Sequence, residues 1–250
     1  MIKHFAKFRF VSYFYLYLYC MRKIYYFLVL VTVPLLLNPS CKRTGSVPEQ
    51  LEADYIEYQV NYLESMAGDI PTKMLPDIMK SYYSKRYILT SINGFFGQFS
   101  LVQVADLRKN TVTTMLNFFG NKVYYTGEKG EIPAGIAGIE NPRVSLTNDT
   151  VQICGMVSKK AIIETDDEQF EVYFTEEIDI ESPNITTPYR FIEHVLSDFR
   201  VQLSILKMQL VMHHHEKTTV GSDIFAVPDD YEQVSKETME AIINSLFTKD

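Results

Sequence analysis

Residues that could do chemistry gather first at His213-His214-His215-Glu216. On a strand, His213 and His215 share one face and could bind zinc or copper through two imidazoles. Two ligands do not make a zinc site, which takes three or four, and no spacing fixes His194 or Glu216 as a further ligand. We therefore expect exposed strand histidines here, with no metal and no other cofactor bound.

A cysteine and a run of acids are the other candidates. Cys154 follows Ile153 within an apolar pattern, which predicts a buried or half-buried thiol rather than a nucleophile. The acidic run, from Glu168 to Glu181, predicts a solvated edge, and paired carboxylates for glycoside chemistry stay open although no spacing selects a pair. The sequence has no GxSxG, HExxH, CxxC, phosphate-loop or dinucleotide motif. We predict a non-enzymatic protein with no catalytic residue.

Residues 1–41 predict the compartment of the protein. Met21-Arg22-Lys23 is a basic start, the fourteen residues 24–37 are apolar, and Asn38-Pro39-Ser40-Cys41 follows. This order is typical of a secretory signal peptide. The apolar run is shorter than the about 20 residues that span a bilayer. Translation from Met21 is one interpretation of residues 1–20, and a long two-part signal anchor is the other.

Cys41 resembles the acylated cysteine of bacterial lipoproteins. Ser40 fits the small residue of a lipobox, whereas Pro39 and Asn38 depart from it. Each buried methylene of an acyl chain contributes about 0.8 kcal/mol, so two or three chains on Cys41 would anchor the protein to a membrane. Lys42 stands where an aspartate would signal retention, and by resemblance to lipoprotein sorting this favours the periplasmic face of the outer membrane. An ordinary signal peptide or an uncleaved anchor is the alternative.

Charge and length limit the remaining part of the chain. The 250 residues have a net charge of −7, and residues 1–41 hold five basic residues and no acid, which leaves residues 42–250 with a net charge of −12. Such an acidic chain without a basic patch is not expected to bind nucleic acid. We predict a polar tether over residues 42–50 and a single domain over residues 51–250. Cys154 is the one thiol of that domain, so no disulfide forms within it.

Alternation of apolar residues predicts strands over most of the domain. Residues 56–62 alternate, Asn93-Gly94 predicts a hairpin turn, and residues 150–163 predict one strand that turns at Asp166-Asp167. The alternation changes phase near Leu206, which needs a bulge or a turn. Residues 127–149 are rich in glycine and predict a long loop, either a lid or a disordered insertion.

Two helices are predicted among the strands. Residues 183–194 predict a short helix. Ser235 can cap a second helix whose apolar stripe has the spacing i, i+3, i+4, i+7; the stripe consists of Met239, Ile242, Ile243 and Leu246. The predicted fold class is α+β, with a large curved antiparallel sheet, or half-barrel, and a few helices including the amphipathic C-terminal one.

Three short motifs resemble a family of uncharacterised bacterial envelope proteins. Residues 151–161, VQICGMVSKKA, match its pattern I-x-G-y-x-c-K-K-A; residues 172–178, VYFTEEI, match its next strand; and residues 225–231, FAVPDDY, match F-x-V-P-x-x-Y. The family resembles the lipoprotein-carrier (LolA/LolB-like) architecture, an antiparallel half-barrel closed by helices over an apolar cavity. The resemblance implies this fold for about residues 54–240 and implies no catalytic residue. Ser158 lies near the place of the family's second cysteine, which this chain lacks.

Three functions stay open. We expect an exported, lipid-anchored envelope protein that binds a lipid or acyl chain in the concavity of the half-barrel. The second hypothesis is a scaffold that docks an envelope protein on a face of the sheet, and the third is a hydrolase. An enclosed apolar cavity would favour the first, a filled core with an exposed aromatic patch the second, and a polar cleft with clustered acids or histidines the third.

Overall fold

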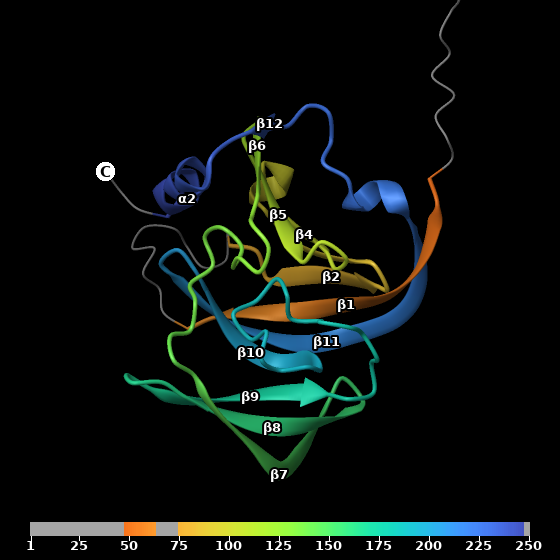
Figure 1. The fold of residues 1–250 in the computed structure, drawn as a ribbon, viewed down its shortest axis with the longest axis vertical. Helices are drawn as coiled ribbons and strands as arrows, with labels where there is room; N and C mark the ends of the chain where they lie inside the picture. The colour runs from red at the N-terminus through yellow and green to blue at the C-terminus, as the bar shows by residue number, and fades with distance from the viewer. Residues whose placement is uncertain (1–47, 64–74, 248–250) are drawn as a thin grey trace, which may run out of the picture. The chain divides into compact units, whose positions relative to one another are not determined.

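Twelve strands form one open sheet in the computed structural model, which describes residues 48–63 and 75–247 (Figure 1). The signal segment, Cys41 and most of the predicted tether lie outside the described residues. The elements are β1 (Gln50–Tyr62), β2 (Ile78–Ser84), β3 (Tyr87–Gly94), η2 (Phe95–Gly97), β4 (Phe99–Asp106), β5 (Thr111–Phe118), β6 (Asn121–Thr126), β7 (Arg143–Ile153), β8 (Met156–Glu164), β9 (Gln169–Thr175), β10 (Val195–Leu203), β11 (Leu206–Gly221), η3 (Ser222–Phe225), β12 (Glu232–Gln233) and α2 (Lys236–Ser245).

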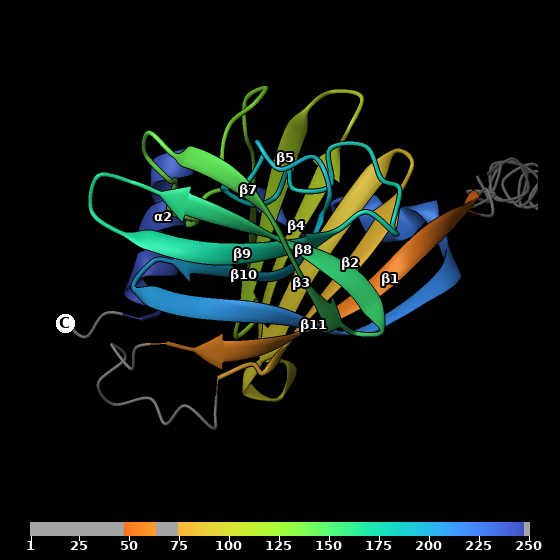
Figure 2. The same cartoon turned by 90° about the horizontal axis from the view of Figure 1, so that it is seen from below.

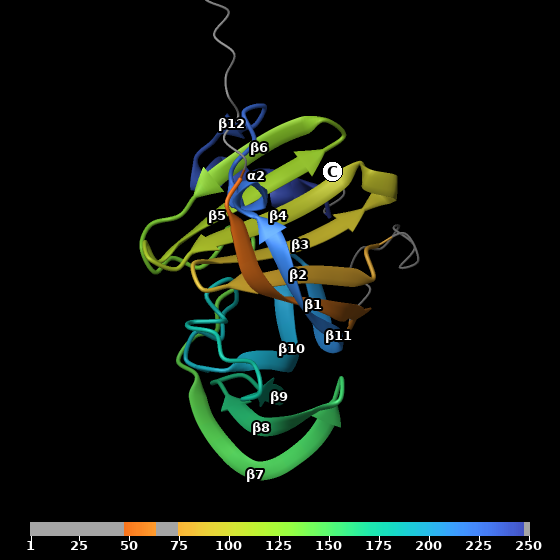
Figure 3. The ribbon, with the colours of Figure 1, turned by 90° about the vertical axis from the view of Figure 1, so that its right-hand side faces the viewer.

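The sheet consists of two meanders that meet at β1 and β11. Strands β1 to β6 are neighbours in chain order, and so are β7 to β11; β1 pairs with β11 between the two groups. Figure 3 shows β2 to β6 on one side of this central pair and β7 to β9 on the other. All pairs are antiparallel except β12, which adds two residues in parallel to β6. The predicted large, curved antiparallel sheet is confirmed.

The α+β fold class is wrong, because the fold is mainly β. Within the described ranges the sheet dominates and α2 is the one α-helix. The helix predicted over residues 183–194 is a series of turns instead. The amide of Asn184 donates hydrogen bonds to the carbonyl oxygens of Ile192 and His194, at 2.6 and 2.8 Å, and these bonds fold the segment back on itself.

One face of the sheet, which we call the inner face, carries the main hydrophobic core. Both meanders supply fully buried side chains to it, among them Tyr58, Ile88, Leu116, Ile163 and Leu210. The segment between β9 and β10 adds Ile185, Tyr189 and Ile192, which are also buried. Arg190 fixes this segment by donating to the carbonyl oxygens of Ile185 and Glu131, at 2.7 and 2.5 Å. The chain therefore fills much of its own inner face.

A smaller core lies on the opposite face of β3 to β5. Leu89, Val104 and Met115 are buried there beneath Phe225 of η3. The Phe225 ring stacks on Tyr87, with centroids 5.1 Å apart. Residues 222–231, which follow β11, thus cover part of the outer face.

Three hairpins turn on pairs of residues with positive φ. Phe96-Gly97 joins β3 to β4, Phe119-Gly120 joins β5 to β6, and Cys154-Gly155 joins β7 to β8, with φ between 49° and 86° throughout. The hairpin predicted at Asn93-Gly94 is present, but its turn lies at residues 95–98, since Gly94 still pairs with Phe99.

Two boundaries also differ from the predictions made around residues 127–163. The Cys154-Gly155 turn divides the single strand predicted over residues 150–163 into β7 and β8. The loop predicted over residues 127–149 ends at residue 142, because β7 begins at Arg143. The change of phase near Leu206 is a turn, as one alternative predicted: Leu203 pairs with Leu206 around Ser204, whose φ is 54°.

The capped C-terminal helix is confirmed. The Ser235 hydroxyl accepts a hydrogen bond from the Thr238 N–H at 3.2 Å, which satisfies one of the unpaired donors at the start of α2. Met239 and Ile243 are 0% and 1% exposed, so the predicted apolar stripe faces the core. No helix in the described ranges is long and apolar enough to cross a membrane.

Candidate functional site

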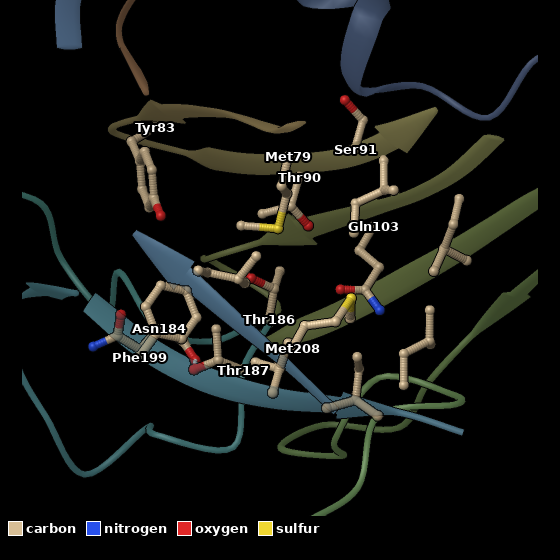
Figure 4. A pocket seen from close by; sticks show the side chains of 16 residues that line it. Met79, Tyr83, Thr90, Ser91, Gln103, Asn184, Thr186, Thr187, Phe199 and Met208 are labelled. Carbon is tan, nitrogen blue, oxygen red and sulfur yellow. Dashed lines mark hydrogen bonds between the residues drawn. The ribbon is translucent and has the colours of Figure 1, made fainter. Parts of the chain in front are cut away.

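The inner face holds a small cavity between the two meanders. Its volume is about 40 Å³, and side chains of β2, β3 and β4 face those of β10, β11 and the segment 184–187 across it (Figure 4). By volume it holds roughly three water molecules. Most of its lining is apolar, with Met79, Leu101, Phe199 and Met208 among the contributors.

A row of buried polar side chains crosses the inner face beside this cavity. Ser81, Thr90, Gln103 and Thr114 are direct cross-strand neighbours on β2 to β5. Gln103 is 6% exposed, and its Nε2 has no hydrogen-bond partner among the described residues. An unpaired buried amide is costly. Figure 4 shows the Gln103 amide directed into the cavity, where there is room for water.

A second hollow is larger, open and polar. It measures about 520 Å³, within the range of about 300–1,000 Å³ typical of small-molecule sites. Four parts of the chain meet around it: residues 137–140, the β8–β9 turn, Pro188-Tyr189, and the adjoining ends of β10 and β11. The lining residues are Leu63, Ala137, Gly138, Ile139, Glu140, Thr165, Asp166, Asp167, Glu168, Phe170, Pro188, Tyr189, Arg200, Val201, Gln202 and Lys207. We call this hollow the polar cleft.

The β8–β9 turn gives the polar cleft an acidic wall. The Thr165 hydroxyl accepts from the N–H groups of Asp167 and Glu168, at 3.3 and 3.1 Å. The Thr165 N–H in turn donates to the Glu168 carbonyl oxygen at 2.9 Å. These bonds fix the turn and leave the side chains of Asp166, Asp167 and Glu168 exposed.

Another part of the lining is aromatic and basic. The Tyr189 hydroxyl donates to the Arg200 carbonyl oxygen at 2.6 Å, and burial raises the pKa of Tyr189, so the phenol remains a neutral donor. The Arg200 guanidinium lies over the Phe170 ring, 5.9 Å from its centroid. Arg200 and Lys207 are both exposed on this side.

Residues 137–140 form a third part of the lining, and the stretch from Gly135 to Ala137 is bonded to β10 and the turn after it. The Ala137 N–H donates to the Gln202 carbonyl oxygen, and the Ser204 N–H donates to that of Gly135, both at 2.9 Å. Ile136 bridges to Leu203 in the same stretch. The polar cleft is therefore built from fixed backbone on three sides, and part of the loop predicted from the sequence borders it.

The histidine cluster lies far along β11, where this strand pairs with β1. His213 is the extra residue of a bulge, since Glu57 pairs with His214 and Tyr58 with Met212. His213 Nε2 lies 3.6 Å from the Glu57 carboxylate, and His215 Nε2 lies 2.8 Å from that of Asp54. Each imidazole thus has its own acidic neighbour.

No group of three or more His, Cys, Asp or Glu in the described residues could hold a metal ion. Cys154 is half-buried in its turn, and burial raises the pKa of its thiol. In the acidic run, Glu176 pairs with Lys159 at 2.8 Å and Glu171 with Lys160 at 3.3 Å. Of that run, the structure places Glu168 in the polar cleft.

Sequence reasoning missed the basic and aromatic wall of the polar cleft and the exposed aromatic turns. Tyr189 and Arg200 carry no local motif. Phe96 and Phe119 did leave a signal, because Phe-Phe-Gly occurs at residues 95–97 and again at residues 118–120.

Comparison with known proteins gives a likeness in fold alone. No family model and no curated protein matches the chain. The structure of PNGF-II in a C2 crystal form is similar, with 15% sequence identity, a TM-score of 0.50, and coverage of 77% of this chain and 32% of that chain. PNGF-II in a P21 crystal form gives 15% identity, a TM-score of 0.51, and coverage of 77% and 33%. This chain thus spans about a third of the length of PNGF-II.

Proposed function

We propose that the protein is an exported, non-enzymatic binding protein of the cell envelope, and that it takes up a polar ligand in the polar cleft. The observation that carries this proposal is the difference between the two hollows: about 520 Å³ for the polar cleft and about 40 Å³ for the inner cavity. A small-molecule ligand fits the former and not the latter.

The walls of the polar cleft indicate the chemistry of the ligand. Asp166, Asp167 and Glu168 line the polar cleft together with Arg200 and Lys207. A ligand with hydrogen-bonding groups or with charges of both signs would match these walls, whereas an acyl chain offers no group that could bond to the carboxylates or to the Arg200 guanidinium. The cleft carboxylates are exposed and belong to one turn, an arrangement that suits binding better than general acid and base chemistry.

The apolar ligand expected from the sequence is the second candidate, and the apolar lining of the inner cavity favours it. In this proposal the curved sheet acts as a half-barrel of the lipoprotein-carrier type. A lipid would have to displace the segment 184–187, whose side chains of Asn184, Ile185 and Thr186 are buried. The energetic cost of exposing these side chains makes the polar cleft the better-supported site.

Native mass spectrometry of the full chain distinguishes the two ligands. We expect a small polar molecule to co-purify with the wild-type protein and with Arg108→Ala, an exposed arginine outside the polar cleft. Arg200→Ala should lose this molecule. A lipid that co-purifies equally with all three proteins would contradict the polar-cleft proposal and favour the inner cavity.

The envelope location is proposed from Cys41 and the segment before it. Acylation of Cys41 would tether the domain to the periplasmic face of the outer membrane. Cys41→Ser should then abolish acylation and release the protein from membranes. Unchanged membrane association of this variant would favour an uncleaved anchor.

A further inference from the structure

Two Phe-Phe-Gly turns lie next to each other at one end of the sheet. Phe96 is 101% exposed and Phe119 is 65% exposed, although both are large apolar side chains. Phe99 and Phe118 pair across β4 and β5, and the Phe119 N–H donates to the Gln98 carbonyl oxygen at 2.8 Å. The two rings therefore belong to neighbouring hairpin tips. We call Phe96 and Phe119 with their turns the aromatic tips.

The backbone of the aromatic tips is strained. Phe96 has φ 54° and Phe119 has φ 49°, in the left-handed region that bulky residues avoid. Asparagine or glycine adopts this conformation at lower cost, as Asn110 does elsewhere in the sheet with φ 54°. Strained residues of this kind cluster where a protein binds something. A strained phenylalanine at each of two adjacent tips indicates that the exposed rings have a binding role.

The surroundings of the aromatic tips indicate what the rings meet. Residues 93–100 and 117–122 contain no acid in an otherwise acidic chain. Their polar residues are uncharged apart from Lys122, which pairs with Asp230. Neither Phe96 nor Phe119 lines the inner cavity or the polar cleft. The rings therefore stand on protruding turns, away from any described hollow that could receive a partner's side chain.

We propose that the aromatic tips insert Phe96 and Phe119 into the interface of a zwitterionic lipid bilayer. Phenylalanine, like tryptophan and leucine, occurs on the apolar face of segments that lie in this interface, with its ring at the boundary between headgroups and acyl chains. Two protruding tips suit the soft surface of a bilayer, while asparagine and glutamine side chains around them can bond to headgroups. The net negative charge of the chain disfavours contact with an anionic bilayer.

The position of the aromatic tips also makes this contact distinct from the proposed tether. They lie near the end of β1 at Tyr62, because the end of β1, the start of β2 and the ends of β3 and β5 share that side of the sheet. The described chain enters β1 at Gln50, at the other end of the strand (Figure 2). The inference depends on neither the polar cleft nor acylation of Cys41.

The absence of tryptophan from the sequence gives a direct test. Phe96→Trp and Phe119→Trp each place one tryptophan at an aromatic tip of the full chain. With phosphatidylcholine vesicles we expect the emission of each to shift to the blue and to be quenched by brominated lipid. Leu146→Trp, at a position on β7 that is 70% exposed, should keep the emission of a residue in water.

A double variant measures how much the Phe96 ring contributes to insertion of the neighbouring tip into the bilayer. In the Phe119→Trp protein, Phe96→Asn should lower the fraction of tryptophan in the bilayer about tenfold, the effect of one exposed phenylalanine on transfer. Cys154→Asn, at the corresponding position of the third turn, should leave that fraction unchanged. Asparagine suits both backbones, so both variants are expected to fold.

Two outcomes would overturn the proposal. One is unquenched, water-like emission of both tip tryptophans in the presence of the vesicles, whether or not the full chain binds to them. The other is a blue shift that depends on protein concentration without lipid, because the aromatic tips would then pack against a second copy of the chain.

Discussion

Phe96, Phe119 and Cys154 adopt a left-handed backbone conformation, which raises the conformational free energy of three hairpin turns. For residues other than glycine this conformation costs roughly 1–2 kcal/mol each. Phe119 recovers part of the cost because its ring meets Phe118 edge-on, with centroids 4.7 Å apart. Phe96 is fully exposed, so its ring recovers little by burial.

Replacing Phe96 by asparagine should therefore stabilise the protein. We expect Phe96→Asn to raise the free energy of unfolding by about 1 kcal/mol, measured from the urea midpoint at unchanged slope. Asn110→Ala, which removes asparagine from a residue of φ 54°, should lower it by about 1 kcal/mol. A loss of stability in Phe96→Asn would show that the ring has a stabilising contact.

Alanine substitutions at Gly135 and Gly130 distinguish the effect of backbone strain on stability from that of steric crowding. Their φ values are 81° and 80°, but a Cβ on Gly135 would lie 2.8 Å from Ile243 Cδ1, whereas one on Gly130 would meet nothing within 4 Å. Gly130→Ala should cost about 1 kcal/mol through strain alone. Gly135→Ala should cost about 3 kcal/mol, because overpacking adds to it. Equal losses in thermal unfolding would mean that α2 moves aside freely.

At the scale of elements, α2 depends on its buried stripe. Ile243 is 1% exposed, so Ile243→Asp would place an unpaired charge in the core and should cost several kcal/mol, with unfolding or detachment of α2. Glu240 lies on the exposed side, 4.0 Å from Lys236, and Glu240→Ala should be nearly silent. Circular dichroism and urea unfolding measure both effects. A folded, fully stable Ile243→Asp protein would contradict this packing.

Glu131 joins α2 to β6 and to the loop before Ile136. Its carboxylate accepts from Lys236 at 2.5 Å, from Tyr125 at 2.9 Å and from the Glu128 N–H at 2.7 Å. Burial alone would raise the pKa of Glu131, but these hydrogen bonds outweigh it and hold the pKa below the usual carboxyl range. A lowered pKa stabilises the fold above the pKa of the unfolded chain, and this stabilisation is lost as the pH falls.

Because the pKa of Glu131 is lowered, the contribution of its carboxylate to the free energy of unfolding should decrease as the pH falls. Glu131→Gln should lower the free energy of unfolding by about 1 kcal/mol at pH 7, and the difference from wild type should vanish between about pH 5 and pH 3. Urea unfolding at several pH values measures it. The matched variant Glu240→Gln, which removes a weak surface pair with the same lysine, should show no such trend. A difference for Glu131→Gln that does not change with pH would mean that this carboxylate titrates normally.

Local patterns were enough to predict most strands and the capped helix, because alternation and the Ser235 cap act over a few residues. They placed the turns at Asp166-Asp167 and near Leu206, but misplaced the turn between β3 and β4 and missed the one at Cys154-Gly155. Asn93-Gly94 is the stronger local turn sequence, yet the observed register pairs Ile92 with Leu101 and so directs both apolar side chains to the core. Register over the whole hairpin outweighs the preference of two residues.

At the scale of the molecule, the polar cleft was not predictable from sequence patterns. Residues 137–140, 165–168 and 200–207 are far apart in the chain, and only the folded sheet brings them together. The filling of the inner face was missed for the same reason. Residues 183–194 have no strong periodicity, and their burial depends on hydrogen bonds such as those of Asn184, which connect parts of the segment that local patterns do not relate.

The pairing of β1 with β11 also determines the order in which parts of the chain can fold. A ribosome that has made the first 200 residues has completed β1 to β6, but β1 still lacks one neighbour, because β11 begins at Leu206. The two meanders can form early from local contacts, whereas their union needs partners about 150 residues apart. Folding should therefore be slow and end with β11 closing the gap between β10 and β1. Until then both edges are open to mispairing, and a chaperone that covers them would raise the yield of native protein.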